Sequence, residues 1–320
     1  MKRRDFLIWV LAGPLASPAL AQKRPAITIL HSGYPTRTPI AHLFEALKTL
    51  GYENGRSASI ELLGGEGDPA RLKALVDKLL AHPPDVIIAL TSPAVVALKQ
   101  AGVKTPVVFA FVPDPVALGL VESLARPGGS FTGVTYSGAG LGAKRLEILS
   151  DALPSVRRIA VIWNPSFREN AAIVDSIRRS ASHRRIEVFS RELRAPNDLV
   201  NAFDEVVRAG AGAAIFMSDN VMFGRRKEVA AVELAHRLPS IHSFEPEARD
   251  GALMSFGADS NESYRRAAAL ASEVLKGARP ADLPVEEPTK FTLSINLRTA
   301  KALGLTIPQE VLLRADEVIE

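Results

Sequence analysis

The chain has 320 residues, of which 47% are hydrophobic and 23% are charged, a balance typical of a globular protein long enough for two domains. The formal net charge is +4, and the basic pairs are scattered without aromatic residues between them, which argues against a nucleic-acid-binding surface. The absence of cysteine excludes disulfides, thiolate chemistry and a lipidated cysteine.

Residues 1–21 have the pattern of an export signal. Basic residues at positions 2–4 precede a mostly apolar stretch, residues 7–20, which is too short to span a bilayer. Ala19-Leu20-Ala21 matches a signal cleavage site, so we predict a mature chain that begins near Gln22 and is soluble in the periplasm. The basic run also fits the twin-arginine pattern, so Sec and twin-arginine export both remain open. Cleavage would remove three basic residues and one acidic residue, leaving a net charge of +2.

Two halves of the chain repeat one pattern of short apolar runs and helical stretches. The apolar runs of the first half are AITILHSG, SASIELLGG, PDVIIAL and TPVVFAFV, with helices expected over 39–50, 69–81 and 93–101 between them. Those of the second half are RRIAVIWN, IEVFSREL, AAIFMSD and PSIHSF, with helices expected over 169–182, 196–209 and 224–237. Continuous apolar strands alternating with helices indicate buried parallel sheets. The sequence therefore predicts an α/β protein with two doubly wound lobes.

Three further segments belong to neither repeat. Residues 130–149 contain four glycines and fit a strand that leaves lobe one for a hinge. Residues 251–277 fit a strand, a polar cap and a long helix, and KFTLSIN fits one more strand. Gly138 to Ala143 also match the G-x-G-x-x-A dinucleotide motif, but the next strand ends in Asn164 rather than in an acidic residue, so we interpret these glycines as hinge residues.

Ligands of doubly wound sheets bind at the carboxyl ends of the strands, where this chain places small polar residues. Ser92 followed by Pro93 fits a helix N-terminus, which attracts a carboxylate, although Ser92 could simply cap its helix. Asp219 could bind an ammonium group or cap the next helix. Asp114, between two prolines, fits a turn, with ligand contact as the second possibility.

Signals for an enzyme are weak. The common nucleophile, phosphate-loop and zinc-protease motifs do not occur, and the six histidines have no metal-ligand spacing. His31 and His242 follow strands and are interpreted as polar cleft or packing residues. We expect no catalytic set, no cofactor and no metal.

Several long segments resemble one protein family. They include DPVALGLVESLARPGGSFTG, LGYENGRSASIE, GALMSFG, and the C-terminal LLRADEVIE. They are similar to the periplasmic substrate-binding proteins of ABC transporters in the TrpX-like family. The resemblance implies a type I periplasmic-binding-protein fold, a three-strand hinge, a ligand in the cleft and an inner-membrane ABC permease as partner. Thr91-Ser92-Pro93 departs from the family pattern, which often has Gly-Thr-Pro there.

We therefore predict a monomeric periplasmic receptor that closes on an amino acid or a related small carboxylate. The expected units are a signal peptide (1–21), lobe one (22–135 and 257–283) and lobe two (136–256 and 284–320). The expected ligand-binding residues are Ser32, Tyr34, Thr91, Ser92, Asp114, Ser218, Asp219, Asn220 and Phe244. Phe111 and Phe256 are further candidates to pack an apolar group. A periplasmic sensor for a membrane signalling protein is the alternative, and an exported enzyme on the same scaffold is a third hypothesis.

Overall fold

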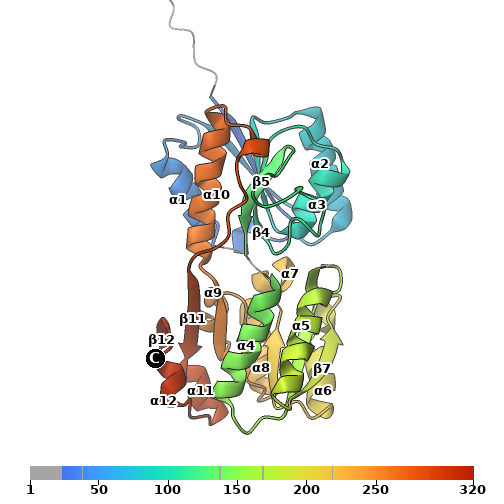
Figure 1. The fold of residues 1–320 in the computed structure, drawn as a ribbon, viewed down its shortest axis with the longest axis vertical. Coiled ribbons are helices and arrows are strands. Elements are labelled where there is room, and N and C mark those ends of the chain that lie inside the picture. The colour runs from blue at the N-terminus through green and yellow to red at the C-terminus, as the bar shows by residue number, and fades with distance from the viewer. Residues whose placement is uncertain (1–23, 38, 137, 168, 218) are drawn as a thin grey trace, which may run out of the picture.

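The computed structural model describes residues 24–320 except residues 38, 137, 168 and 218. Two lobes are stacked along the long axis of the molecule, and each is built from a β-sheet and helices (Figure 1). The predicted export signal lies outside the described residues. This arrangement confirms the predicted α/β fold with two lobes.

Lobe one contains a five-stranded parallel sheet with the order β2-β1-β3-β4-β5. Its strands are β1 (Ala26–His31), β2 (Ser59–Gly64), β3 (Val86–Leu90), β4 (Val107–Val112) and β5 (Phe131–Thr135). Its helices are α1 (Ala41–Thr49), α2 (Pro69–Ala81), α3 (Ser92–Gln100) and α10 (Ser260–Leu275), with short 3-10 turns at Pro35–Arg37 and Pro280–Asp282.

Both faces of this sheet are covered, as the continuous apolar strands predict. Along β3, Ile88 packs with α1 and α10, whereas Ile87 and Ala89 pack with α2 and α3 on the opposite face. Successive side chains of a strand point to opposite faces, so all of them must be apolar when both faces are buried.

Lobe two contains seven strands with the order β12-β11-β10-β9-β8-β6-β7, parallel except for the antiparallel pair β10–β11. Its strands are β6 (Arg158–Trp163), β7 (Glu187–Glu192), β8 (Ala213–Phe216), β9 (Ser240–His242), β10 (Met254–Ala258), β11 (Phe291–Asn296) and β12 (Glu317–Ile319). Its helices are α4 (Gly138–Ala152), α5 (Glu169–His183), α6 (Leu199–Arg208), α7 (Asn220–Gly224), α8 (Arg226–Ala235), α9 (Glu245–Arg249), α11 (Leu297–Leu303) and α12 (Gln309–Leu312), with a 3-10 turn at Pro196–Asp198.

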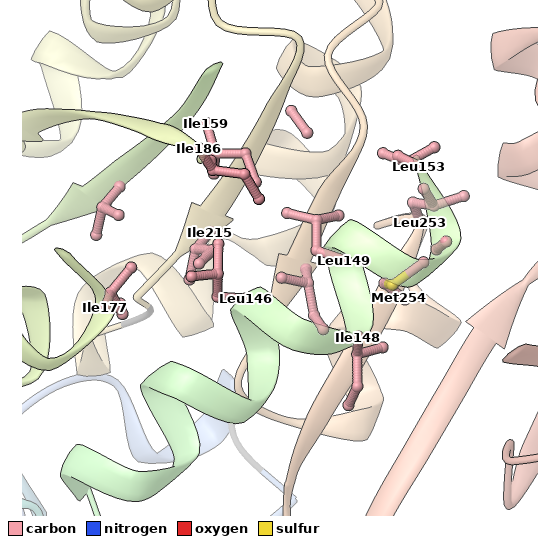
Figure 2. Close-up of a cluster of buried hydrophobic side chains, with 14 of the residues drawn as sticks. Leu146, Ile148, Leu149, Leu153, Ile159, Ile177, Ile186, Ile215, Leu253 and Met254 are labelled. Atoms are coloured by element: carbon pink, nitrogen blue, oxygen red, sulfur yellow. The ribbon is translucent and has the colours of Figure 1, made fainter. Parts of the chain in front are cut away.

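Helices α4 and α5 cover one face of this sheet, and α6 and α8 cover the other. Figure 2 shows Leu146 and Leu149 of α4 beside Ile215 of β8. Every side chain labelled there is at most 8% exposed, so this cluster is a closed core. It fixes the start of α5, which carries part of the site described below.

The chain passes between the lobes three times, between β5 and α4, between β10 and α10, and between Asp282 and β11. Helix α10 packs against α1 in lobe one, whereas β10 and β11 pair with each other in lobe two. The predicted lobe boundaries, after residues 135, 256 and 283, lie near these crossings and stay predictions. No helix in the described part of the chain is long and apolar enough to cross a membrane.

The interpretation of the 138–143 glycines as hinge residues is wrong for Gly140 and Gly142, because both lie inside α4. A Cβ atom on Gly142 would lie 2.8 Å from Cγ2 of Ile173 in α5. This glycine therefore allows the two helices to approach closely.

Candidate functional site

A cleft lies between the lobes, at the carboxyl ends of strands from both sheets. Its empty volume, including space open to solvent, is about 710 Å³. Lobe one contributes His31, Pro39, Thr91, Ser92, Phe111, Pro113, Ser260 and Tyr264. Lobe two and the first crossing contribute Tyr136, Phe167, Glu169, Asn170, Asp219, Asn220, Phe223 and Phe244.

The hydroxyl groups predicted at the ends of β1 and β3 lie together. Oγ of buried Ser32 lies 2.5 Å from Oγ1 of Thr91, so Ser32 supports the cleft wall from behind without lining the cavity. Ser92 is the first residue of α3 and not its N-cap, which is Thr91, and Thr91 makes no capping bond with its side chain. The hydroxyl of Ser92 instead donates to Oε1 of Glu169 in lobe two at 2.5 Å.

The backbone of Thr91 has φ +80° and ψ 150°, a conformation that essentially only glycine adopts without strain. Phe111, also on the cleft, has φ +60°. Strained residues of this kind cluster at ligand sites, and these two turn the ends of β3 and β4 into the cleft.

Asp219 lies at the opposite wall and is only 6% exposed. Its Oδ1 accepts the backbone N–H groups of Val221 and Met222, each at 2.7 Å, so it caps α7. Its Oδ2 accepts the amide of Asn164 at 2.6 Å. Three of the roughly four acceptor positions of the carboxylate are therefore filled by the protein.

Aromatic rings form the apolar part of the cleft. Phe244 of lobe two contacts Phe111 of lobe one edge-on, with ring centroids 6.1 Å apart. Phe223 and Tyr136 lie 5.6 and 5.8 Å from the Phe244 ring, and Tyr264 lies 5.0 Å from the Phe111 ring. Such a lining suits a flat apolar group, because edge-on and stacked ring contacts add to the burial of apolar surface.

The cleft contains a neutral histidine. Burial lowers the pKa of His31 to about 4, and Nδ1 accepts the backbone N–H of Gly33 at 2.9 Å. The acceptor role of Nδ1 requires the neutral ring, so both observations assign the same state. His31 therefore offers the cleft a polar ring without a charge at neutral pH.

A buried ionic group fixes Phe244 from behind. Nε2 of His242 lies 2.8 Å from Glu233, and Nδ1 lies 3.1 Å from Oε1 of Glu247. Burial alone would lower the pKa of His242, but the charges of the two glutamates outweigh it and raise the pKa to about 10. Oε2 of Glu247 in turn accepts the backbone N–H groups of Ser243 and Phe244. The charged histidine thus orients the carboxylate that holds the aromatic wall.

The two lobes touch across the cleft. A Cβ atom on Gly33 of lobe one would lie 2.6 Å from the backbone oxygen of Asn220, and one on Gly67 would lie 2.6 Å from Cγ2 of Val221. Asn220 and Val221 begin α7, which lies at the junction of the lobes (Figure 1). With the hydrogen bond between Ser92 and Glu169, these contacts define a closed arrangement.

The structure brings together Thr91, Ser92, Asp219, Asn220 and Phe244 of the predicted residues, and it also places the further candidate Phe111 at the cleft. Other predicted residues lie elsewhere. Half-buried Tyr34 does not line the cleft, and exposed Asp114 accepts the backbone N–H of Ala117 in a turn. Phe256 packs against the lobe-two core and stacks on Phe291 at 6.2 Å. Ser218 lies outside the described residues.

Among the lining residues that the prediction missed are Glu169 in the first turn of α5, Tyr136 at the first crossing and Phe223 near the end of α7. Each lies several residues beyond a strand end or within a connecting segment. The sequence does contain a sign that Glu169 belongs to the site, because it is an acidic residue at the start of an expected helix that follows a strand. Within the described residues, no three His, Cys, Asp or Glu side chains are arranged to hold a metal ion.

Comparison with known proteins adds an independent line of evidence. The family model described as ABC transporter substrate binding protein matches residues 31–319. A tyrosine-binding protein of Clostridioides difficile (strain R20291) is 29% identical over 263 residues, which are 82% of this chain and 75% of that protein.

Two crystal structures show the same fold. A conserved domain protein from Vibrio cholerae has a TM-score of 0.86 at 24% identity. A Streptococcus pneumoniae ABC domain in complex with L-Trp has a TM-score of 0.83 at 24% identity. In both comparisons the match covers 92% of this chain and 100% of the other. The family match, which spans nearly the whole described chain, confirms the resemblance: the chain belongs to the substrate-binding proteins of ABC transporters.

Proposed function

We propose that this protein is a periplasmic receptor of an ABC importer and that its ligand is an aromatic amino acid. The observation that carries the proposal is the cleft itself, in which aromatic rings from both lobes surround polar groups at strand ends. A zwitterion with an aromatic side chain complements both parts of such a site. The tyrosine-binding relative and the neighbouring structure with L-Trp support this ligand class.

In this proposal the carboxylate of the ligand lies at the start of α3. Helix N-termini present unpaired N–H groups, and the hydroxyls of Thr91 and Ser92 add two donors there. The aromatic group packs between Phe111, Phe223 and Phe244. Ligand binding draws the lobes together about the three crossings, and the closed monomer then delivers the ligand to an inner-membrane permease.

A thermal-shift screen followed by calorimetry tests the ligand class. The mature chain is tested with the twenty amino acids, with aromatic acids that lack the amine, and with myo-inositol as a polyol control. A ligand at one hundred times its Kd stabilises the folded state by about 2.7 kcal/mol, which gives a clear rise in Tm. We expect L-tyrosine or L-tryptophan to give the largest rise. A response to the polyol without any response to aromatic amino acids would refute the proposal.

The variant Phe223→Leu checks that the response arises in the cleft. It should weaken the binding of the aromatic amino acid by about 2- to 12-fold, because an aromatic pair contributes about 0.5–1.5 kcal/mol beyond its buried area. Phe189→Leu is the matched control, since Phe189 packs against the far core of lobe two. It should leave Kd unchanged.

A further inference from the structure

The carboxylate of Glu169 occupies an unusual position. It belongs to the first turn of α5 in lobe two, yet its Oε1 accepts the hydroxyl of Ser92 at the start of α3 in lobe one, 2.5 Å away. This is where the proposed function puts the carboxylate of the ligand. In this closed arrangement, a side chain of the protein therefore occupies the position proposed for the carboxylate of the ligand.

Glu169 and Asp219 are the acidic side chains among the described residues that line the cleft, and they differ in how many hydrogen bonds they accept from the protein. Asp219 accepts two backbone N–H groups and the amide of Asn164, and its task is to start α7. For Glu169, the hydroxyl of Ser92 is the hydrogen-bond partner that the described residues provide. Glu169 is thus the carboxylate with acceptor capacity to spare.

The chemistry of an α-amino acid connects these observations. Its carboxylate and its ammonium group are attached to the same carbon, so a ligand whose carboxylate binds Ser92 brings its ammonium group next to the position that Glu169 now occupies. An ammonium group close to a carboxylate in a partly desolvated cleft forms a charge-assisted hydrogen bond, which is stronger than a neutral one. A ligand with a carboxylate and no amine would instead meet the negative charge of Glu169.

We propose that Glu169 is the specificity-determining carboxylate of the cleft. It leaves Ser92 when an α-amino acid binds and then accepts the ammonium group of the ligand, so that it selects for amines and against lone carboxylates. This inference rests on the proposed function, and it moves the ammonium contact expected for Asp219 in the sequence analysis to Glu169.

Two series of probes separate the amine from the carboxylate. One consists of L-tyrosine, tyramine and 3-(4-hydroxyphenyl)propanoate, and the other of L-tryptophan, tryptamine and indole-3-propanoate. Calorimetry on the mature chain compares the wild type with Glu169→Gln, which keeps an oxygen that can accept from Ser92. The decisive quantity is the ratio of the Kd of the deaminated acid to the Kd of the amino acid.

In the wild type the acid should bind at least about tenfold more weakly than the amino acid. Glu169→Gln should weaken the amino acid and the amine by about 10- to 100-fold, because a hydrogen bond to a charged group is lost. The same variant should bind the acid equally well or more tightly, so the ratio falls. A merely structural role for Glu169 would weaken all three probes alike, and that result would overturn the inference.

Two control variants complete the test. Asp219→Asn preserves an oxygen for capping α7 and should leave the ratio unchanged; a ratio that falls in this variant would return the ammonium contact to Asp219. Asp175→Asn changes an exposed acid on the same helix and should have no effect. If the wild type binds an amino acid that Glu169→Gln binds equally well, this inference fails and the proposed function stands. If the wild type binds none of the six probes, both fail.

Discussion

The replacement Gly33→Ala should hold the lobes apart without unfolding either of them. Gly33 follows β1 in lobe one, and a Cβ atom there would lie 2.6 Å from the backbone oxygen of Asn220 in lobe two. Its φ is not in the left-handed region, so alanine fits the local backbone. The clash therefore acts only when the cleft is closed.

The size of the effect follows from the contacts across the cleft. An ordinary contact begins near 3.4 Å, so the backbone of α7 must withdraw by several tenths of an ångström. In the ligand-bound form, where the proposed contact across the cleft runs from the ammonium group of the ligand to Glu169, the same withdrawal stretches that contact toward the limit of a hydrogen bond. Losing a hydrogen bond to a charged group costs about 1.5–3 kcal/mol, which corresponds to roughly 10- to 150-fold in the closing equilibrium. Since the ligand binds the closed state, Kd should rise by a similar factor.

Calorimetry with the aromatic amino acid measures the change in Kd, and urea unfolding checks that the free energy of unfolding changes by less than about 0.5 kcal/mol. Gly129→Ala is the matched control, because a Cβ atom there meets nothing within 4 Å. A Kd for Gly33→Ala within threefold of the wild type would show that the close contact between Gly33 and Asn220 does not control closure of the lobes on the ligand.

Three further predictions concern strain and charge. In urea unfolding, the Thr91→Gly variant should be more stable than the Thr91→Ala variant by about 1 kcal/mol, because relief of about 1–3 kcal/mol of backbone strain exceeds the entropic cost of glycine. At exposed Lys73 in α2 the alanine variant should be the more stable of the two. If the glycine variant were the more stable at both sites, strain at Thr91 would not be the cause. The raised pKa of His242 stabilises the folded state fully below pH 6.5, and this contribution should be lost, by up to about 1.4 kcal/mol per pH unit, as the pH rises toward about 10. The urea midpoint should therefore fall less over this pH range in Glu233→Gln than in the wild type. An equal fall would exclude the pair of His242 and Glu233 as the source of the pH dependence. The lowered pKa of His31 acts in the opposite direction: its contribution to the free energy of unfolding is present above pH 6.5 and is lost as the pH falls toward about 4. Over that pH range the His31→Gln variant should lose less stability than the wild type. An equal loss would show that His31 does not titrate in that range.

The sequence predicted the fold well because the information is local and repeated. Each predicted strand and helix of the two halves occurs, and their alternation determines a doubly wound sheet. The helix expected over 224–237 is α8, but the short helix α7 before it was not predicted. Asp219 caps a helix that begins at Asn220, and Arg225, with φ −114°, separates it from α8. Apolar periodicity does not reveal a break of one residue between two helices.

The glycines of 138–143 were misinterpreted for a similar reason. Glycine serves flexible turns and close helix contacts alike, and the choice depends on the element packed against it. Here that element is α5, whose Ile173 is 31 positions beyond Gly142. The site was predicted in outline because strand ends can be located from the pattern, whereas Tyr136 and Phe223 reach the cleft from connecting segments whose direction the pattern does not fix.

The two strand-to-helix junctions show most clearly what local sequence leaves undecided. Ser92 and Asp219 each fit both a capping residue and a ligand-binding residue, and the structure separates them. Asp219 caps its helix, while the hydroxyl of Ser92 points across the cleft. What separates them is their long-range partners: Asn164 lies 55 positions before Asp219, and Glu169 lies 77 positions after Ser92. A carboxylate already satisfied by its own lobe shapes the cleft, whereas a hydroxyl bonded to the other lobe can exchange its partner for a ligand, and in the proposed exchange at Ser92 the carboxylate of the ligand takes the place of Glu169.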